Sequence, residues 1–198
     1  MDELIKQIYK VDLTLNDVQA LTRQKANIIM YDDLTIDDNI LKVIGPTNRA
    51  ILLFPTEAGS VNGHYLCLIY YKDIKTLLHF DSYGWDVQAE LKYSTSRHVQ
   101  RNTLGYLYNK LRGYGYKVIF NTYKYQQMIN GMNTCGRHVA CRLRFHYLNN
   151  NEYAKLMLNQ SNSPDYLVSI ITLLKLDKDN SSEQQIIKSY LNIKSWKG

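Results

Sequence analysis

Residues 63–84 have the sequence GHYLCLIYYKDIKTLLHFDSYG, and this stretch is the most informative part of the chain. Two runs rich in aliphatic and aromatic residues flank a polar Lys-Asp-Ile-Lys turn, which predicts a β-hairpin with its midpoint close to Lys72 and Asp73. His64 and Asp81 lie almost equally far from that midpoint. Opposite residues of an antiparallel pair share a face, with Cβ atoms about 5 Å apart. The hairpin therefore predicts that this imidazole and this carboxylate meet at its open end.

A carboxylate beside a histidine fixes its tautomer and favours the imidazolium, as general acid–base catalysis requires. An ordinary cross-strand ion pair is the alternative for His64 and Asp81. His79 shares the face of Asp81 in a regular strand. We expect a structural role for His79, with a second imidazole near the site as the alternative.

The rest of the chain surrounds this hairpin with further strands and helices. Additional β-rich runs and stretches with helical apolar spacing are separated by glycine, proline and asparagine. The expected strands cover residues 27–31, 49–54 and 116–120, and the expected helices lie within residues 2–26, 99–112, 135–148, 163–175 and 183–193. With no repeat or linker, the sequence predicts one α+β domain over residues 1–198, in which helices flank a central, mostly antiparallel sheet.

Composition narrows the class of protein. The chain has 198 residues, 45% of them hydrophobic and 21% charged, as expected for a globular protein. Its longest clean apolar run, 51–55, is far below the roughly 18 residues of a membrane span. The first ten residues, MDELIKQIYK, show no secretory signal, and three cysteines without a framework spacing favour free thiols in a reducing compartment. The net charge of +6 comes from scattered residues and forms no basic block.

Cys135 lies in the segment NTCGRH, directly before a stretch with helical apolar spacing. A sulfur at a helix N-terminus is close to unsatisfied N–H groups and the positive end of the helix dipole, which stabilise a thiolate. Gly136 would let a substrate approach the backbone closely. The alternative is a small buried hydrophobe, and we expect that role for Cys67 and Cys141.

A pair of glutamines, Gln126 and Gln127, precedes this cysteine. A side-chain amide at the end of a strand can donate a hydrogen bond to a developing oxyanion, together with the backbone N–H of Cys135. A solvated loop is the alternative interpretation of the pair.

The order His64, Asp81, Gln126 or Gln127, then Cys135 resembles that of the adenain/Ulp1-like (SUMO-protease-like) superfamily of cysteine proteases. It is most similar to the compact maturation proteases of virophages and large DNA viruses. The residues that carry the resemblance are Gly63-His64, Phe80-Asp81-Ser82-Tyr83-Gly84, the stretch 121–127 and Thr134-Cys135-Gly136-Arg137-His138. The resemblance implies the adenain/Ulp1-like fold, with a catalytic core over about residues 28–150 and helical extensions at both ends.

The resemblance also implies a role for each site residue. Cys135 would be the nucleophile, His64 the base and Asp81 the carboxylate that orients it. Gln126 would be the oxyanion donor, because it follows residues 121–125 as in the viral relatives, and Gln127 remains open. An aromatic residue commonly follows the family histidine, so Tyr65 is expected to pack beside the imidazole. This chemistry requires no metal or other cofactor.

The implied function is a thiol protease, a hydrolase that cleaves viral capsid and other virion precursors at Gly-containing sites during maturation. A ubiquitin-like (SUMO-type) deconjugase is the alternative activity. Because the adenovirus relative is stimulated by DNA and a peptide, DNA or a peptide is a candidate activator and non-specific DNA a candidate partner. No membrane partner is expected. The expected location is the virion and the cytoplasm or virus factory of the infected host, without secretion.

Two other classes of site fit parts of the sequence. His64 with Cys67 and Cys135 with His138 have the spacing of half zinc sites, but residues three apart in a strand face opposite sides. A non-enzymatic module that binds nucleic acid is the other class. Its basic residues, interleaved with tyrosines, would be Arg97, Arg101, Lys110, Arg112, Lys117 and Lys124. His98 and His138 are expected to have no catalytic role.

Overall fold

The computed structural model describes residues 2–23, 25–55, 63–92, 102–158 and 162–173. The helices are α1 (Asp2–Tyr9), α2 (Leu15–Thr22), α3 (Ile40–Ile44), α4 (Val87–Leu91), α6 (Thr103–Gly113), α7 (Cys135–Arg144), α8 (Asn150–Leu158) and α9 (Pro164–Leu173). The sequence did not predict α3, α4 or α8. The helix expected at 183–193, and residues 99–101 of another, lie outside the described residues. None of the helices in the described ranges is long and apolar enough to cross a membrane.

Five strands form one sheet in the order β1-β2-β3-β4-β5. They are β1 (Asn27–Met30), β2 (Arg49–Pro55), β3 (Gly63–Tyr71), β4 (Thr76–Asp81) and β5 (Lys117–Phe120). The long central strands β2, β3 and β4 pair antiparallel, and the short edge strands β1 and β5 add in parallel to β2 and β4. The predicted α+β class, with helices flanking a central sheet, is confirmed.

The predicted hairpin is formed by β3 and β4, joined by the 3-10 turn η2 (Lys72–Ile74). Tyr71 pairs with Thr76, so the turn is centred one residue later than the sequence suggested. This shift moves the partner of Asp81 by two residues, and Asp81 lies opposite Leu66 instead of His64. A slip of two residues keeps the same face. His64 and Asp81 are therefore diagonal neighbours on one side of the sheet.

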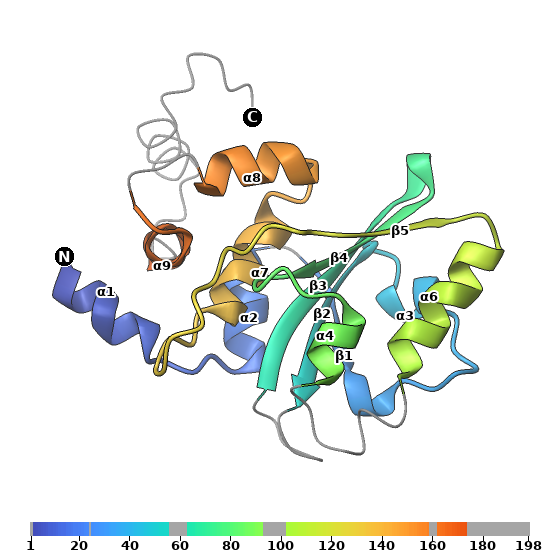
Figure 1. Ribbon diagram of the computed structural model, residues 1–198, viewed down its shortest axis with the longest axis horizontal. Helices are drawn as coiled ribbons and strands as arrows, with labels where there is room; N and C mark the ends of the chain where they lie inside the picture. The colour runs from blue at the N-terminus through green and yellow to red at the C-terminus, as the bar shows by residue number, and fades with distance from the viewer. Residues whose placement is uncertain (1, 24, 56–62, 93–101, 159–161, 174–198) are drawn as a thin grey trace.

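Alternation along the strands creates two cores, one on each face of the sheet. Figure 1 shows the helices that flank the sheet. Tyr65, Cys67 and Ile69 of β3 face α2, α7, α8 and α9. Leu66 and Leu68 face α3, α4 and α6. The central strands are consequently covered on both sides, which explains why they are nearly continuous apolar runs.

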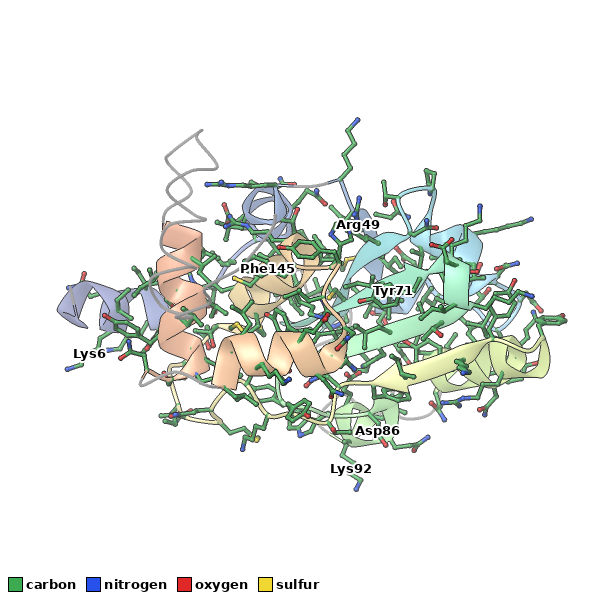
Figure 2. All side chains as sticks on the ribbon, turned by 90° about the horizontal axis from the view of Figure 1, so that it is seen from above. Lys6, Arg49, Tyr71, Asp86, Lys92 and Phe145 are labelled. Atoms are coloured by element: carbon green, nitrogen blue, oxygen red, sulfur yellow. The ribbon has the colours of Figure 1, made fainter. Side chains whose placement is uncertain are left out.

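The C-terminal end of α7 is anchored to the sheet by buried polar contacts, near the labelled Arg49, Tyr71 and Phe145 (Figure 2). The fully buried Arg142 donates to the carbonyl of Phe145 at 2.8 Å and to the hydroxyl of Tyr71 at 2.8 Å. Arg49 hydrogen bonds with the His146 ring at 2.8 Å. These bonds satisfy carbonyls at the helix end and fix the position of α7 along the sheet.

The N-terminal end of α7 packs against α2 through Gly136. A Cβ atom at Gly136 would lie 2.8 Å from Cγ2 of Val18, 3.3 Å from Cδ1 of Leu13 and 3.4 Å from Cδ2 of Tyr65. Thr14 and Asp17 form the capping box that begins α2. Gly136 thus permits close approach of another helix, in addition to lining the space beside Cys135.

We predict that Gly136→Ala destabilises the protein by about 1–3 kcal/mol, because the added methyl group overpacks the contact with Val18. Gly113→Ala is the matched control, since its Cβ would meet nothing within 4 Å and alanine favours a helix by up to about 1 kcal/mol. Urea denaturation of both variants measures the difference. Combining Gly136→Ala with Val18→Ala should cost less than the sum of the single changes. Equal stability of the two glycine variants would contradict this packing.

Candidate active site

His64 and Asp81 form a direct pair at the open end of the hairpin. Nε2 of His64 shares a hydrogen bond with Oδ2 of Asp81. The other oxygen of Asp81 accepts the N–H of Tyr83 at 2.7 Å and the N–H of Trp85 at 3.3 Å. The side chain of His64 is 18% exposed and that of Asp81 is 0% exposed. The buried carboxylate of Asp81 is therefore fixed by backbone N–H groups, while the imidazole of His64 is partly exposed.

Asn121 holds the backbone of Asp81 from the neighbouring segment after β5. Its Oδ1 accepts the N–H of Asp81 at 2.8 Å, and its Nδ2 donates to the carbonyl of Asp81 at 2.7 Å. Asn121 is buried, so both of its amide ends need such partners. Asn121 begins the stretch 121–127 of the resemblance, and these two bonds give it the role of fixing the backbone of Asp81.

The pair shifts the pKa values of both groups. Burial alone would lower the pKa of His64, but the charge of Asp81 and its hydrogen bond outweigh burial and hold the pKa well above its ordinary value. A side-chain hydrogen bond with Cys135 acts in the same direction. For Asp81, burial would raise the pKa, and the charge and hydrogen bond of His64 bring it below its ordinary value. Both shifts favour an imidazolium–carboxylate pair.

The aromatic residues beside His64 are Tyr83 and Trp85. The ring of Tyr83 is stacked on the imidazole at 5.1 Å between centroids and 25° between planes, and the ring of Trp85 lies at 6.2 Å. The expectation that Tyr65 packs there is wrong, because consecutive strand residues face opposite sides. Tyr65 instead belongs to the core on the α7 side of the sheet, and its hydroxyl donates to the carbonyl of Leu13 at 2.8 Å.

Cys135 is the first residue of α7, as predicted, and it is partly exposed. Because Asp81 occupies Nε2 of His64, Nδ1 is the nitrogen that remains for the Cys135 sulfur. Cys67 and Cys141 are fully buried, and burial raises the pKa of Cys67 to about 12. The structure therefore brings the predicted His64, Asp81 and Cys135 together and separates the other two thiols from solvent.

A small cavity of about 210 Å³ opens beside Cys135. The segment that joins α1 to α2 forms one wall of this cavity. The starts of β3 and α7 form the others. The lining residues are Asp12, Leu13, Gly63, Tyr65, Asn133, Cys135 and Gly136. A larger hollow of about 470 Å³ lies between α3 and α6, on the face of the sheet opposite α7. Of these two cavities, only the smaller is lined by a residue of the predicted triad, Cys135.

Gln126 and Gln127 differ sharply in position. Gln126 is buried, its Oε1 accepts the hydroxyl of Ser82 at 2.7 Å and its Nε2 donates to the carbonyl of Met132 at 3.1 Å. The backbone N–H of Gln126 also donates to the carbonyl of Ser82 at 2.9 Å. Gln127 has an exposed side chain. Ser82 follows Asp81 directly, so Gln126 is joined to the strand end that carries the carboxylate.

Two further histidines of the described residues have structural partners. His79 lies between Tyr108 and Glu90, with both ring nitrogens at 2.8 Å from an oxygen. His138 is buried and its Nε2 lies 3.0 Å from Oδ1 of Asp165. These positions agree with the structural roles expected for His79 and His138, and His98 lies outside the described residues.

The residues of the alternative zinc site do not form one group. Cys67 belongs to the core on the α7 side, whereas His64 lies on the opposite face with Leu66. In the part of the chain that the structure describes, no three His, Cys, Asp or Glu side chains are grouped so that they could hold a metal ion.

The described basic residues of the nucleic-acid alternative come from separate segments of the chain. Lys110 and Arg112 belong to α6, and Lys117 begins β5. These three residues and Lys124 have exposed side chains, and Arg97 and Arg101 lie outside the described residues. Nucleic-acid binding by this surface stays a prediction.

Comparison with known proteins finds one that is similar to this chain in sequence. It is 32% identical over 175 residues to an uncharacterized protein V9 of Sputnik virophage, covering 85% of this chain and 98% of that protein. The chain belongs to the family of this V9 protein. No family model matches the sequence. Among solved structures, a de-sumoylating protease has a TM-score of 0.32 and 15% identity, over 94% of this chain and 76% of its own. That similarity is too low to carry an argument.

The V9 relative agrees with the predicted resemblance to virophage proteins, and the chemistry open to this V9-family chain follows from its own residues. A thiol at a helix start, an imidazole whose pKa is raised beside it and a buried carboxylate that pairs with the imidazole can perform nucleophilic attack with proton transfer.

Sequence reasoning missed Ser82, Tyr83, Trp85 and Asp165 as individual partners of the site in this V9-family chain. The first three lie within four residues of Asp81, and this nearness in the chain was the only available signal. Asp165 follows Ser-Pro at the start of α9, a pattern that any helix beginning can show.

We predict that Asp81→Asn lowers the pKa of His64, because the charge that opposes burial is removed. The pair stabilises the folded protein fully at pH values between the unfolded-state pKa of aspartate, about 4, and that of histidine, about 6.5. It is lost as the pH falls through the folded-state pKa of Asp81, and as the pH rises through the raised pKa of His64. An NMR titration of the histidine Cε1–H signals, assigned with His64→Gln, measures the shift. Asp73→Asn, at the other end of the hairpin, is the control. An unchanged His64 pKa in Asp81→Asn would refute this electrostatic assignment.

Proposed function

We propose that this protein is a cysteine-type endopeptidase with Cys135, His64 and Asp81 as its triad. The observation that carries the proposal is the chain of contacts from the Cys135 sulfur through the His64 ring to the buried Asp81 carboxylate. A partly exposed thiol at a helix N-terminus, next to a histidine whose pKa is raised, has the surroundings of a reactive cysteine.

In this mechanism the Sγ of Cys135 attacks the peptide carbonyl carbon, and a C–S bond forms as the carbonyl oxygen takes the negative charge. Collapse of this intermediate breaks the C–N bond, and the imidazolium of His64 protonates the leaving amine from Nδ1. Water then attacks the acyl-enzyme while the neutral imidazole accepts its proton, and the C–S bond breaks to release the acid. Asp81 holds the ring through Nε2.

Gln126 is the proposed oxyanion donor, together with the backbone N–H of Cys135. Its amide is fixed by Ser82 and Met132, and the NH₂ group has a second proton beyond the one used for Met132. A fixed donor stabilises developing charge without reorganisation. Gln127 is less suited, because its exposed side chain has no such support.

The proposed substrates are capsid and other virion precursors, cleaved at Gly-containing sites during maturation. A cavity of about 210 Å³ beside Cys135, floored by the buried Tyr65, suits small residues next to the scissile bond. The proposal places the enzyme in the virion and in the cytoplasm or virus factory of the infected host. DNA or a peptide is the proposed candidate for an activator.

We predict that iodoacetamide labels Cys135 rapidly already near about pH 6 and that His64→Ala abolishes this fast reaction, because the imidazolium no longer stabilises the thiolate. Cys67 should remain unlabelled in the folded protein, since it is fully buried and its pKa is about 12. Peptide mapping of labelled protein from about pH 5 to 9 measures both. Equal slow labelling of all three cysteines would refute the thiolate–imidazolium pair.

We predict that the protein hydrolyses Gly-containing fluorogenic peptides from virion precursors, and that Cys135→Ala and His64→Ala abolish turnover. Asp81→Asn should retain measurable activity, since the ring remains in place. Gln126→Ala should lower kcat by about 100-fold or more, the effect of losing one oxyanion donor. Gln127→Ala is the matched control and should stay within about threefold of the wild type.

The same assay separates the two proteolytic activities. Ubiquitin-like and SUMO C-terminal conjugates are tested beside the virion peptides, with and without DNA. Turnover of the conjugates alone would indicate a deconjugase. Normal turnover by Cys135→Ala would reject a cysteine protease altogether.

A further inference from the structure

Asp165 is a buried carboxylate in the first turn of α9, and it contacts the segment that leads into Cys135. Its side chain is 0% exposed. Oδ2 accepts the backbone N–H of Gln127 at 3.1 Å. Oδ1 accepts the hydroxyl of Thr134 and lies 3.0 Å from Nε2 of His138.

Two of these partners, Gln127 and Thr134, are the first and last residues of the loop that connects the proposed oxyanion donors, Gln126 and the N–H of Cys135. Gln127 directly follows Gln126, and Thr134 directly precedes Cys135. His138 lies about one turn into α7, so it ties the same carboxylate to the helix itself. One side chain from α9 therefore fixes both ends of the loop 127–134 and the helix that presents the nucleophile.

The chemistry of the contacts requires a carboxylate with two acceptor oxygens. A main-chain N–H and a hydroxyl donate to different oxygens of Asp165, and a third donor shares one of them. Bonds to an ionised group are stronger than neutral ones, which offsets the cost of burial. The N-terminal turn of α9 also favours negative charge at this position.

The backbone of Asp165 is itself held firmly. The hydroxyl of Ser163 accepts the N–H of Tyr166 at 3.2 Å, which caps α9, and the hydroxyl of Ser169 donates to the carbonyl of Asp165 at 2.8 Å. A carboxylate supported in this way can impose a position on the loop instead of following it.

We propose that Asp165 is a positioning residue for catalysis, which aligns Gln126 and the N–H of Cys135 through Gln127, Thr134 and His138. The inference rests on the proposed protease function and extends it to α9. Asp165 acts through other groups and does not touch the substrate. Its loss separates the oxyanion donors while the pair of His64 and Cys135 remains in contact.

The test compares Asp165→Asn with Thr172→Val in the full-length protein. Asparagine keeps the volume but has one acceptor oxygen, so it cannot accept all the bonds of the carboxylate. Thr172 is the matched control, because it is buried in the same helix and accepts a bond of 2.7 Å from Arg137 of α7 but none from the loop. Both variants are compared by urea denaturation, kcat, KM and the rate of Cys135 alkylation.

For Asp165→Asn we expect kcat to fall by about 100-fold, with KM and the alkylation rate within about threefold of the wild type. Hydrogen exchange at the Gln127 amide should accelerate, since its acceptor is weakened. Thr172→Val should lose stability but keep kcat. Thr134→Ser, which retains the hydroxyl, should also keep kcat, whereas Thr134→Val should lose it.

The outcomes separate the inference from the function on which it rests. Absence of turnover in the wild type would reject the protease. A wild type that turns over, with Asp165→Asn at the same kcat, would reject only the positioning role. If Asp165→Asn does not fold, Thr134→Val and Thr134→Ser decide, and equal kcat in these two would overturn the proposal. A fall in kcat that Thr172→Val reproduces at equal stability loss would also overturn it.

Discussion

The arrangement of the site depends on the alternation of side chains in β3. His64 points to the face of the sheet with α3, α4 and α6, whereas Tyr65 faces α7. An imidazole on one face and a thiol from a helix on the other can meet only where the sheet ends. The start of β3 is such a place, and Gly63, whose Cβ would collide with the backbone of β2, lets the strands approach closely there.

The same constraint limits where the start of α7 can lie. α7 has to reach the end of β3 without displacing it, and three sets of contacts determine its position. Arg142 anchors one end of the helix to β3, Gly136 admits α2 beside it, and Asp165 holds the other end. These contacts come from segments far apart in the chain, so the geometry at Cys135 reflects the whole fold more than the local sequence.

The hairpin, the shared face of His64 and Asp81 and the start of α7 at Cys135 could be predicted, because each depends on local alternation or helical spacing. The register could not, since a 3-10 turn shifted the pairing by two residues. Parallel pairing of β1 and β5 also has no local signal. Choosing between Gln126 and Gln127, and finding Asp165, required contacts over dozens of residues.

The place of Asp165 in the chain has a consequence for the order of biosynthesis. The ribosome makes His64, Asp81 and Cys135 before it makes α9. A chain that ends before α9 lacks the carboxylate that accepts the N–H of Gln127 and the hydroxyl of Thr134. Under the proposed function, the loop 127–134 would take its described position only after α9 has been translated and has docked, so activity would begin after residue 165 has been made.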